Sequence, residues 1–127
     1  MTKYLNPPMT ENELLEMSNF WGENLGLDKS LVLWIGSSSS AQCRIKVSNL
    51  PKESNMHSKD CFTISIPNLE IIGNVNKEHI TTKKLKSIFE FIKINKDLLL
   101  NLCEGAIDIV DFIKGFVKYF NNNQKLL

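Results

Sequence analysis

The pattern of hydrophobic and polar residues predicts a helix near the start of the chain. Thr10 and Glu13 have the spacing of a capping box, and apolar side chains then recur at helical intervals. We therefore expect a helix over residues 11–22, ended by one of the glycines that follow. Residues 1–9 contain two adjacent prolines and are expected to form an extended lead-in.

The middle of the chain has the patterns of β-strands. The first run is almost wholly apolar, and the second alternates between an inward apolar set and an outward pair, Arg44 and Lys46. The polar stretches 36–40 and 50–60 have no period and are expected to be loops. The predicted strands are 31–35, 42–48, 61–66 and a short edge strand at 69–73.

The hydrophobic period becomes 3.6 residues after the last predicted strand. One amphipathic helix is expected to end near Cys103, with Asn95 as a candidate break within it. Asp108 is placed to begin a last helix, whose apolar side chains recur as far as Phe120. Residues 121–127 are expected to form a frayed tail.

The order of these elements predicts an α+β fold in a single domain over residues 1–127. We expect a three- to four-stranded antiparallel meander, with an amino-terminal helix and two to three carboxy-terminal helices packed on one face. A chain of 127 residues with 43% hydrophobic residues can bury one core and hardly more. No apolar run approaches the length of a membrane span, so we expect a cytoplasmic protein without a membrane segment.

The cysteines favour a reducing compartment. Cys43, Cys61 and Cys103 are odd in number and widely spaced, so we expect three reduced, mostly buried thiols. His57 is the only histidine close in sequence to a cysteine, which is too sparse for a zinc site, and we expect no metal and no cofactor. A small hydrolase or transferase built around His57 and Cys61 remains an alternative.

The charge balance argues against a dedicated nucleic-acid protein. The formal net charge is +1 at pH 7, and Arg44 is the only arginine. A weak RNA- or DNA-binding strip is the alternative, formed by Arg44, Lys46 and Lys52 beside the ring of Trp34. Packing of Trp34 in the core is the simpler interpretation of its apolar run.

An excess of apolar residues in the last helix favours a binding function. Val110 and Val117 lie off the main hydrophobic stripe, so this helix is expected to be either sandwiched within the monomer or placed in an interface. The carboxylates of the first helix would suit a basic protein partner, and the last helix could also form a homodimer. The expected partner-binding residues are Glu11, Glu13, Glu16, Phe116 and Phe120.

Segments 44–49, 62–66 and 85–99 together resemble small uncharacterised bacterial proteins of a strand-hairpin-plus-helix type, and the likeness spans residues 31–103. Domains of this kind have no known function and often lie near toxin–antitoxin-like or mobile-element genes. Relatives carry His and Pro before the arginine strand, where this chain has residues 40–43 (Ser-Ala-Gln-Cys), so chemistry at those positions is expected to be absent. The resemblance implies a non-enzymatic protein-binding module, either a toxin–antitoxin partner or a phage- or plasmid-encoded inhibitor of a host defence system.

Overall fold

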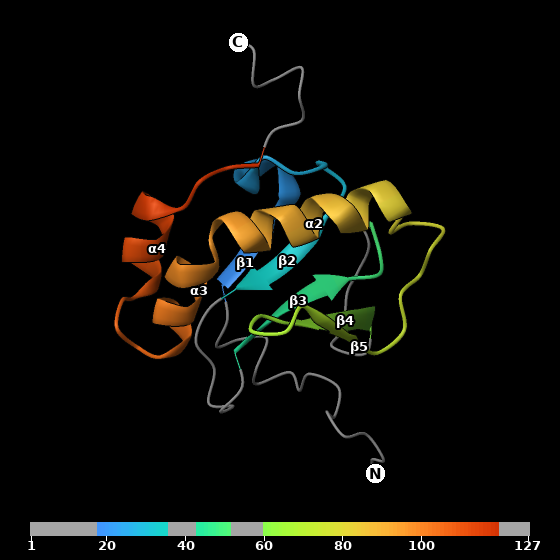
Figure 1. The fold of residues 1–127 in the computed structure, drawn as a ribbon. Helices are drawn as coiled ribbons and strands as arrows, with labels where there is room; N and C mark the ends of the chain where they lie inside the picture. Colours follow the sequence, from blue (N-terminus) through green and yellow to red (C-terminus); the bar gives the residue numbers. More distant parts are fainter. Residues whose placement is uncertain (1–17, 36–42, 52–59, 120–127) are drawn as a thin grey trace.

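A five-stranded antiparallel sheet forms one layer of the molecule, and helices cover one of its faces (Figure 1). The computed structural model describes residues 18–35, 43–51 and 60–119. The strands lie in the sheet in chain order, each antiparallel to the next, which confirms the predicted meander. They are β1 (Ser18–Trp21), β2 (Val32–Ile35), β3 (Arg44–Ser48), β4 (Cys61–Ser65) and β5 (Glu70–Ile72).

The number of strands differs from the prediction because the first strand replaces part of the expected first helix. The prediction of a helix over 11–22 is wrong for residues 18–21, which pair with β2 instead, and residues 11–17 lie outside the described ranges. Phe20 is the one buried side chain of the four, so this segment needs a period of two rather than 3.6. A 3-10 helix, η1 (Gly22–Leu25), follows directly. Pairing with the fully buried strand β2 gives the backbone N–H and C=O groups of this segment the hydrogen-bond partners that they would otherwise have within a helix.

Three α-helices follow the sheet, as the sequence predicted. The candidate break at Asn95 is confirmed, since it separates two helices. The last helix begins after Asp108, whose side chain accepts a hydrogen bond from Asp111 N. This helix ends at Gly115 and does not continue to Phe120. The helices are α2 (Thr82–Ile94), α3 (Lys96–Cys103) and α4 (Ile109–Gly115).

The core lies between the helices and one face of the sheet. Ile45 and Val47 of β3 point into it, as their alternation predicted, and Leu99 and Leu102 enter from α3. Within the described residues, the buried members of this cluster are Phe20, Leu25, Leu27, Leu31, Leu33, Ile35, Ile45, Val47, Phe62, Ile64, Ile66, Ile80, Ile88, Phe91, Ile92, Leu99, Leu102 and Phe112. The described residues therefore share one continuous core.

The opposite face of the sheet is also buried at its centre. Trp34 lies opposite Lys46 in the register of β2 and β3, and Lys46 lies opposite Thr63 of β4. The prediction that Lys46 points outward to solvent is wrong, because its side chain is only 2% exposed. Its Nζ donates a hydrogen bond to Thr63 Oγ1 over 2.6 Å, so the aliphatic stem is buried while the amine keeps a polar partner.

Two of the cysteines form a disulfide bond. Cys43, just before β3, is joined to Cys103 at the end of α3, with their Cα atoms 5.4 Å apart. Cys61 is free and half-buried. The prediction of three reduced thiols is therefore wrong for this pair. The two residues are 60 positions apart, and only the packing of α3 on the sheet brings them together.

Candidate functional site

A groove lies between the junction of α2 with α3 and the chain that follows α4. Its volume is about 470 Å³, and Ile94, Leu98 and Val117 provide its apolar lining. Lys96 and Asp97 add charges of both signs. The groove is therefore lined about equally by polar and apolar groups.

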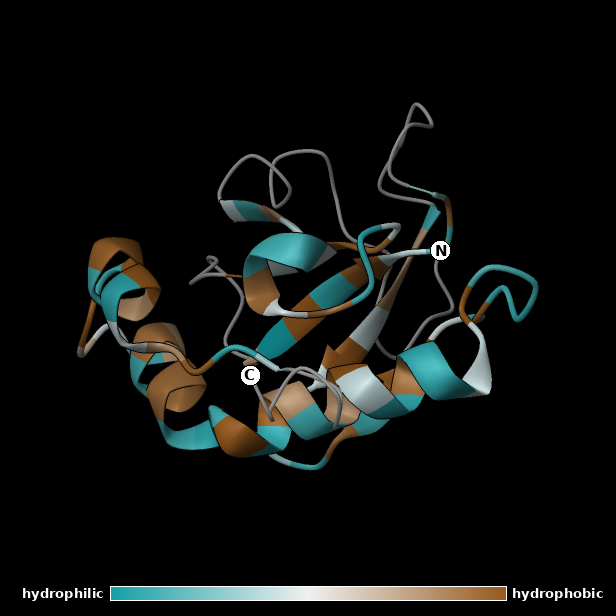
Figure 2. Cartoon of the chain, turned by 90° about the horizontal axis from the view of Figure 1, so that it is seen from above, coloured by the Kyte–Doolittle hydropathy of each residue, from teal (hydrophilic) through white to brown (hydrophobic). Residues whose placement is uncertain are grey.

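Exposed aliphatic side chains gather around this groove and on α4. Ile94 and Val117 are 51% and 55% exposed, and Val110 and Ile113 of α4 are 51% and 50% exposed. Val110 and Ile113 are three residues apart in one helix, so they occupy the same face. Figure 2 shows the apolar residues, in brown, along α3 and α4 at one end of the molecule. We call Ile94, Val110, Ile113 and Val117 the aliphatic surface.

The side chain of Asn95 stabilises the groove through hydrogen bonds to the backbone around it. Asn95 is 4% exposed, and its Nδ2 donates to Val117 O over 2.8 Å. Val117 N donates in turn to Asn95 Oδ1 over 2.7 Å, so one amide side chain satisfies both backbone groups of Val117. Asn95 Nδ2 also donates to Phe91 O over 3.0 Å. The residue that separates α2 from α3 therefore also holds the segment beyond α4.

The segment beyond α4 is held on its other side by η1. Tyr119 N donates to Leu25 O over 2.8 Å. Gly26 has φ +80°, and a Cβ atom at this position would collide with the carbonyl group of Tyr119. We call the hydrogen bonds of Asn95 with Val117 and of Leu25 with Tyr119 the neutral clasp.

Phe116, predicted to contact a partner, is part of the packing that supports the groove. Its ring stacks on Phe112 at 5.3 Å between centroids and meets Phe91 edge-on at 6.1 Å. Phe116 is half-buried against the core. The structure therefore turns Phe112 and Phe116 inward and leaves Val110 and Ile113 outside. The other predicted partner-binding residues, Glu11, Glu13, Glu16 and Phe120, lie outside the described ranges.

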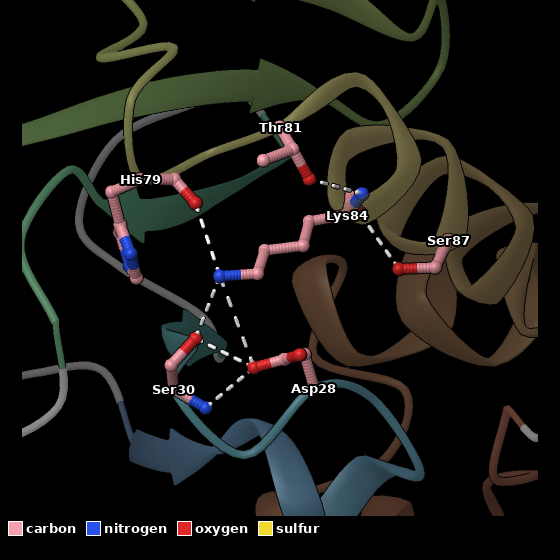
Figure 3. Close-up of polar contacts among 6 residues, drawn as sticks. All are labelled: Asp28, Ser30, His79, Thr81, Lys84 and Ser87. Atoms are coloured by element: carbon pink, nitrogen blue, oxygen red, sulfur yellow. Dashed lines mark hydrogen bonds and ion pairs between the residues drawn. The ribbon is translucent and has the colours of Figure 1, made fainter.

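A second polar arrangement lies at the opposite end of α2 (Figure 3). Lys84 Nζ donates to Ser30 Oγ over 3.0 Å and to His79 O over 3.1 Å, and it lies 4.0 Å from Asp28 Oδ1. Ser30 Oγ donates to Asp28 Oδ1 over 2.6 Å. Thr81 caps α2 by accepting a hydrogen bond from Lys84 N. We call Asp28, Ser30, His79 and Lys84 the charged cluster.

Two groups of the charged cluster have shifted pKa values. The hydroxyl of Ser30 lowers the pKa of Asp28, and Ser30 N and the charge of Lys84 act in the same direction against partial burial. Burial lowers the pKa of His79, and the charge of Lys84 lowers it further. The arrangement joins the 28–30 turn to α2.

Sequence reasoning missed both polar arrangements. The spacing of Asp28 and Ser30 is typical of an Asx-turn, and that was the available signal for the charged cluster. Nothing in the local sequence links Lys84 to Ser30 or Asn95 to Val117.

The predicted nucleic-acid strip does not come together at the surface. Trp34 is 6% exposed, which confirms its expected packing in the interior, and Lys46 is buried beside it. Arg44 is half-buried, and Lys52 lies outside the described ranges. A buried ring cannot stack on a base, and a buried amine cannot reach a phosphate. The described part of the strip does not have the geometry of a nucleic-acid interface.

The predicted cysteine–histidine pair is described only in part. Cys61 is the first residue of β4 and pairs with Ser48, whereas His57 lies outside the described ranges. Over residues 18–35, 43–51 and 60–119, no three His, Cys, Asp or Glu side chains gather closely enough to bind a metal ion.

Comparisons with family models, curated proteins and solved structures returned no match to this chain. Among the described helices, none has both the length and the apolar character needed to cross a lipid bilayer.

Proposed function

We propose that this chain is a non-enzymatic protein-binding module that contacts its partner through the aliphatic surface and the adjoining groove. The observation that carries this proposal is the set of exposed aliphatic side chains around the groove and on α4. Six large hydrophobic residues are exposed in the described part of the chain; of these, Ile94 and Val117 line the groove, and Val110 and Ile113 lie on α4. Exposed apolar patches on small domains often mark sites of protein contact.

The size of the hydrophobic contribution is compatible with specific binding. Complete burial of an aliphatic side chain contributes about 1.5–3 kcal/mol. In each of these four side chains only about half of the surface is exposed and could still be covered by a partner. Covering all four would therefore contribute on the order of 3–6 kcal/mol, part of which offsets the entropy lost on association. Polar contacts at Lys96 and Asp97 would have to supply the rest of the binding free energy, and they would set the orientation of the partner.

The biological setting that we propose follows the family resemblance. It is that of a toxin–antitoxin partner, or of a phage- or plasmid-encoded inhibitor of a host defence system. A basic partner would be drawn by Glu11, Glu13 and Glu16, whereas the rim of the groove has charges of both signs. A triple Glu→Gln variant at these positions, titrated at low salt, separates the two contributions to binding.

The test of this function compares two matched variants in a pull-down from the source cell. Ile113→Asp places a charge on the aliphatic surface, and Ile71→Asp places one on β5, where Ile71 is also exposed. We expect the wild-type chain and Ile71→Asp to recover the same partner, and Ile113→Asp to lose it. Equal recovery by both variants, with unfolding midpoints close to that of the wild type, would contradict the proposal. Sedimentation of the purified chain then shows whether a second copy is the partner.

A further inference from the structure

The disulfide bond lies at the edge of the core. Cys43 and Cys103 are each half-buried, so the bond is not enclosed within the fully buried cluster. The free Cys61 lies at the other end of the β3–β4 pair, since it pairs with Ser48 while Arg44, next to Cys43, pairs with Ser65. Cys61 is therefore not placed to exchange with this bond.

The fold does not depend on this bond for its core. Small domains that need disulfides lack a sufficient core, whereas here a continuous apolar cluster fills the space between sheet and helices. The bond instead joins one helix to one strand. Its local effect falls on α3, whose last residue is Cys103.

Helix α3 is also a wall of the groove. Lys96, Asp97, Leu98 and Asn101 all line it, and all belong to α3. The helix is only eight residues long, so it depends on attachments at its two ends. Asn95 holds the amino end through the neutral clasp, and the disulfide holds the carboxyl end against the sheet.

We propose that the Cys43–Cys103 bond is a thiol-exchangeable clamp that controls the groove. This inference rests on the proposed function, because it concerns the regulation of the same surface. With the bond closed, α3 is fixed and the groove is formed. With the bond open, the carboxyl end of α3 is released, α4 loosens with it, and the partner binds less tightly.

The exchange needs a low-molecular-weight thiol of the glutathione class. Its thiolate attacks one sulfur, the S–S bond breaks, and the departing cysteine takes up a proton. A second thiol attacks the mixed disulfide, which frees the other cysteine and yields the oxidised small molecule. Over these two steps together, the protein gains two electrons and two protons. The oxidised small disulfide reverses each step and closes the clamp again.

Hydrogen exchange on the full chain tests the clamp without any partner. The amides are compared before and after reduction by glutathione, in a Cys61→Ser background that leaves a single pair of thiols. We expect amides of α3 and α4 to exchange at least tenfold faster in the reduced protein, while those of β3 and β4 change less than twofold. A Cys43→Ser/Cys103→Ser variant should show the reduced pattern and ignore the reductant.

Four outcomes would overturn the clamp: equal exchange of α3 in both states, equal acceleration of the strands, a bond that glutathione cannot open in the folded protein, or partner capture that reduction leaves unchanged. Failure of the proposed function gives a different result. If α3 loosens on reduction but Ile113→Asp still captures the partner, the clamp stands and the proposed surface is wrong. If Ile113→Asp abolishes capture but reduction leaves it unchanged, the surface stands and its redox control is wrong.

Discussion

The two ends of α2 are attached to the rest of the molecule by different chemistry. At its amino end the charged cluster joins Lys84 to Asp28 and Ser30, in a setting where the Asp28 side chain is 45% exposed. At its carboxyl end the neutral clasp joins the buried Asn95 to Val117. Both attachments bring distant parts of the chain together. They differ in exposure and in charge.

This difference determines how each attachment responds to its surroundings. Hydrogen bonds between buried neutral groups are insensitive to salt and pH, and their loss leaves polar groups without partners. Contacts between exposed charges are screened by salt and change with protonation. We therefore expect the neutral clasp to hold the groove in shape under all ordinary conditions, and the charged cluster to make a smaller contribution that depends on the solvent.

The largest expected effect is that of Gly26→Ala. A Cβ at this position would collide with the Tyr119 carbonyl group in addition to straining a backbone with φ +80°. We expect a loss of about 2–4 kcal/mol in the free energy of unfolding, measured in urea. Gly105→Ala is the matched control, because Gly105 has φ +82° and nothing within 4 Å of the added atom. If Gly105→Ala lost as much unfolding free energy as Gly26→Ala, the close approach of Tyr119 to Gly26 would contribute nothing beyond the backbone strain.

The next effect is that of Asn95→Ala, which removes the side chain that pairs with Val117. The N–H and C=O groups of Val117 lose their partners, and we expect a loss of about 2–3 kcal/mol in the same urea measurement. Asn101→Ala on the exposed side of α3 should change stability by less than about 0.5 kcal/mol. A loss for Asn95→Ala that shrinks in 1 M salt would contradict the neutral character of this attachment.

A smaller effect is expected for Lys84→Met, which keeps the aliphatic stem and removes the charge. We expect a loss of about 0.5–1 kcal/mol at low salt. The loss should fall in 1 M salt, where the Debye length is about 3 Å. Lys86→Met, two residues along α2 and exposed, is the control and should be neutral. An equal loss at both salt concentrations would mean that hydrogen bonds, rather than charge, carry the contribution of Lys84.

The smallest effect is the pH dependence of His79. Its pKa is lowered in the folded protein, so the unfolded chain binds a proton more readily, and stability falls as pH decreases below the unfolded pKa of about 6.5. Thermal unfolding across this range should show a slope that is absent in His79→Gln. Asp28, whose pKa is also lowered, stabilises the fold above about pH 4 and loses this effect in stronger acid. Asp28→Asn should remove the acid limb and extend the His79 slope to lower pH, because the charge of Asp28 raises the pKa of His79.

The sequence predicted elements whose pattern is local and long enough to be unambiguous. The alternation in β3 and the 3.6-residue period of α2 were recognised because each has one face on the core. Residues 18–21 were misassigned because four residues contain too few turns to separate a helix from a strand. Their pairing with β2 decided the matter.

The candidate site was harder to predict than the fold. The excess of apolar residues in the predicted last helix pointed to the region of the proposed aliphatic surface, and Val117, which is exposed, was named among the residues off the main stripe. The choice of Phe116 as a contact residue did not anticipate that its ring packs on Phe91 and Phe112. Which of several apolar residues stays outside depends on what the neighbouring helices leave uncovered.

By itself, the sequence determined the class of the fold, the order of most elements and the break at Asn95, because these follow from periodicity and capping over short distances. Only the tertiary structure decided the Cys43–Cys103 bond, the burial of Lys46 and the two attachments of α2. Each of these joins residues that are far apart along the chain, and a contact of that kind exists only once sheet and helices have packed together.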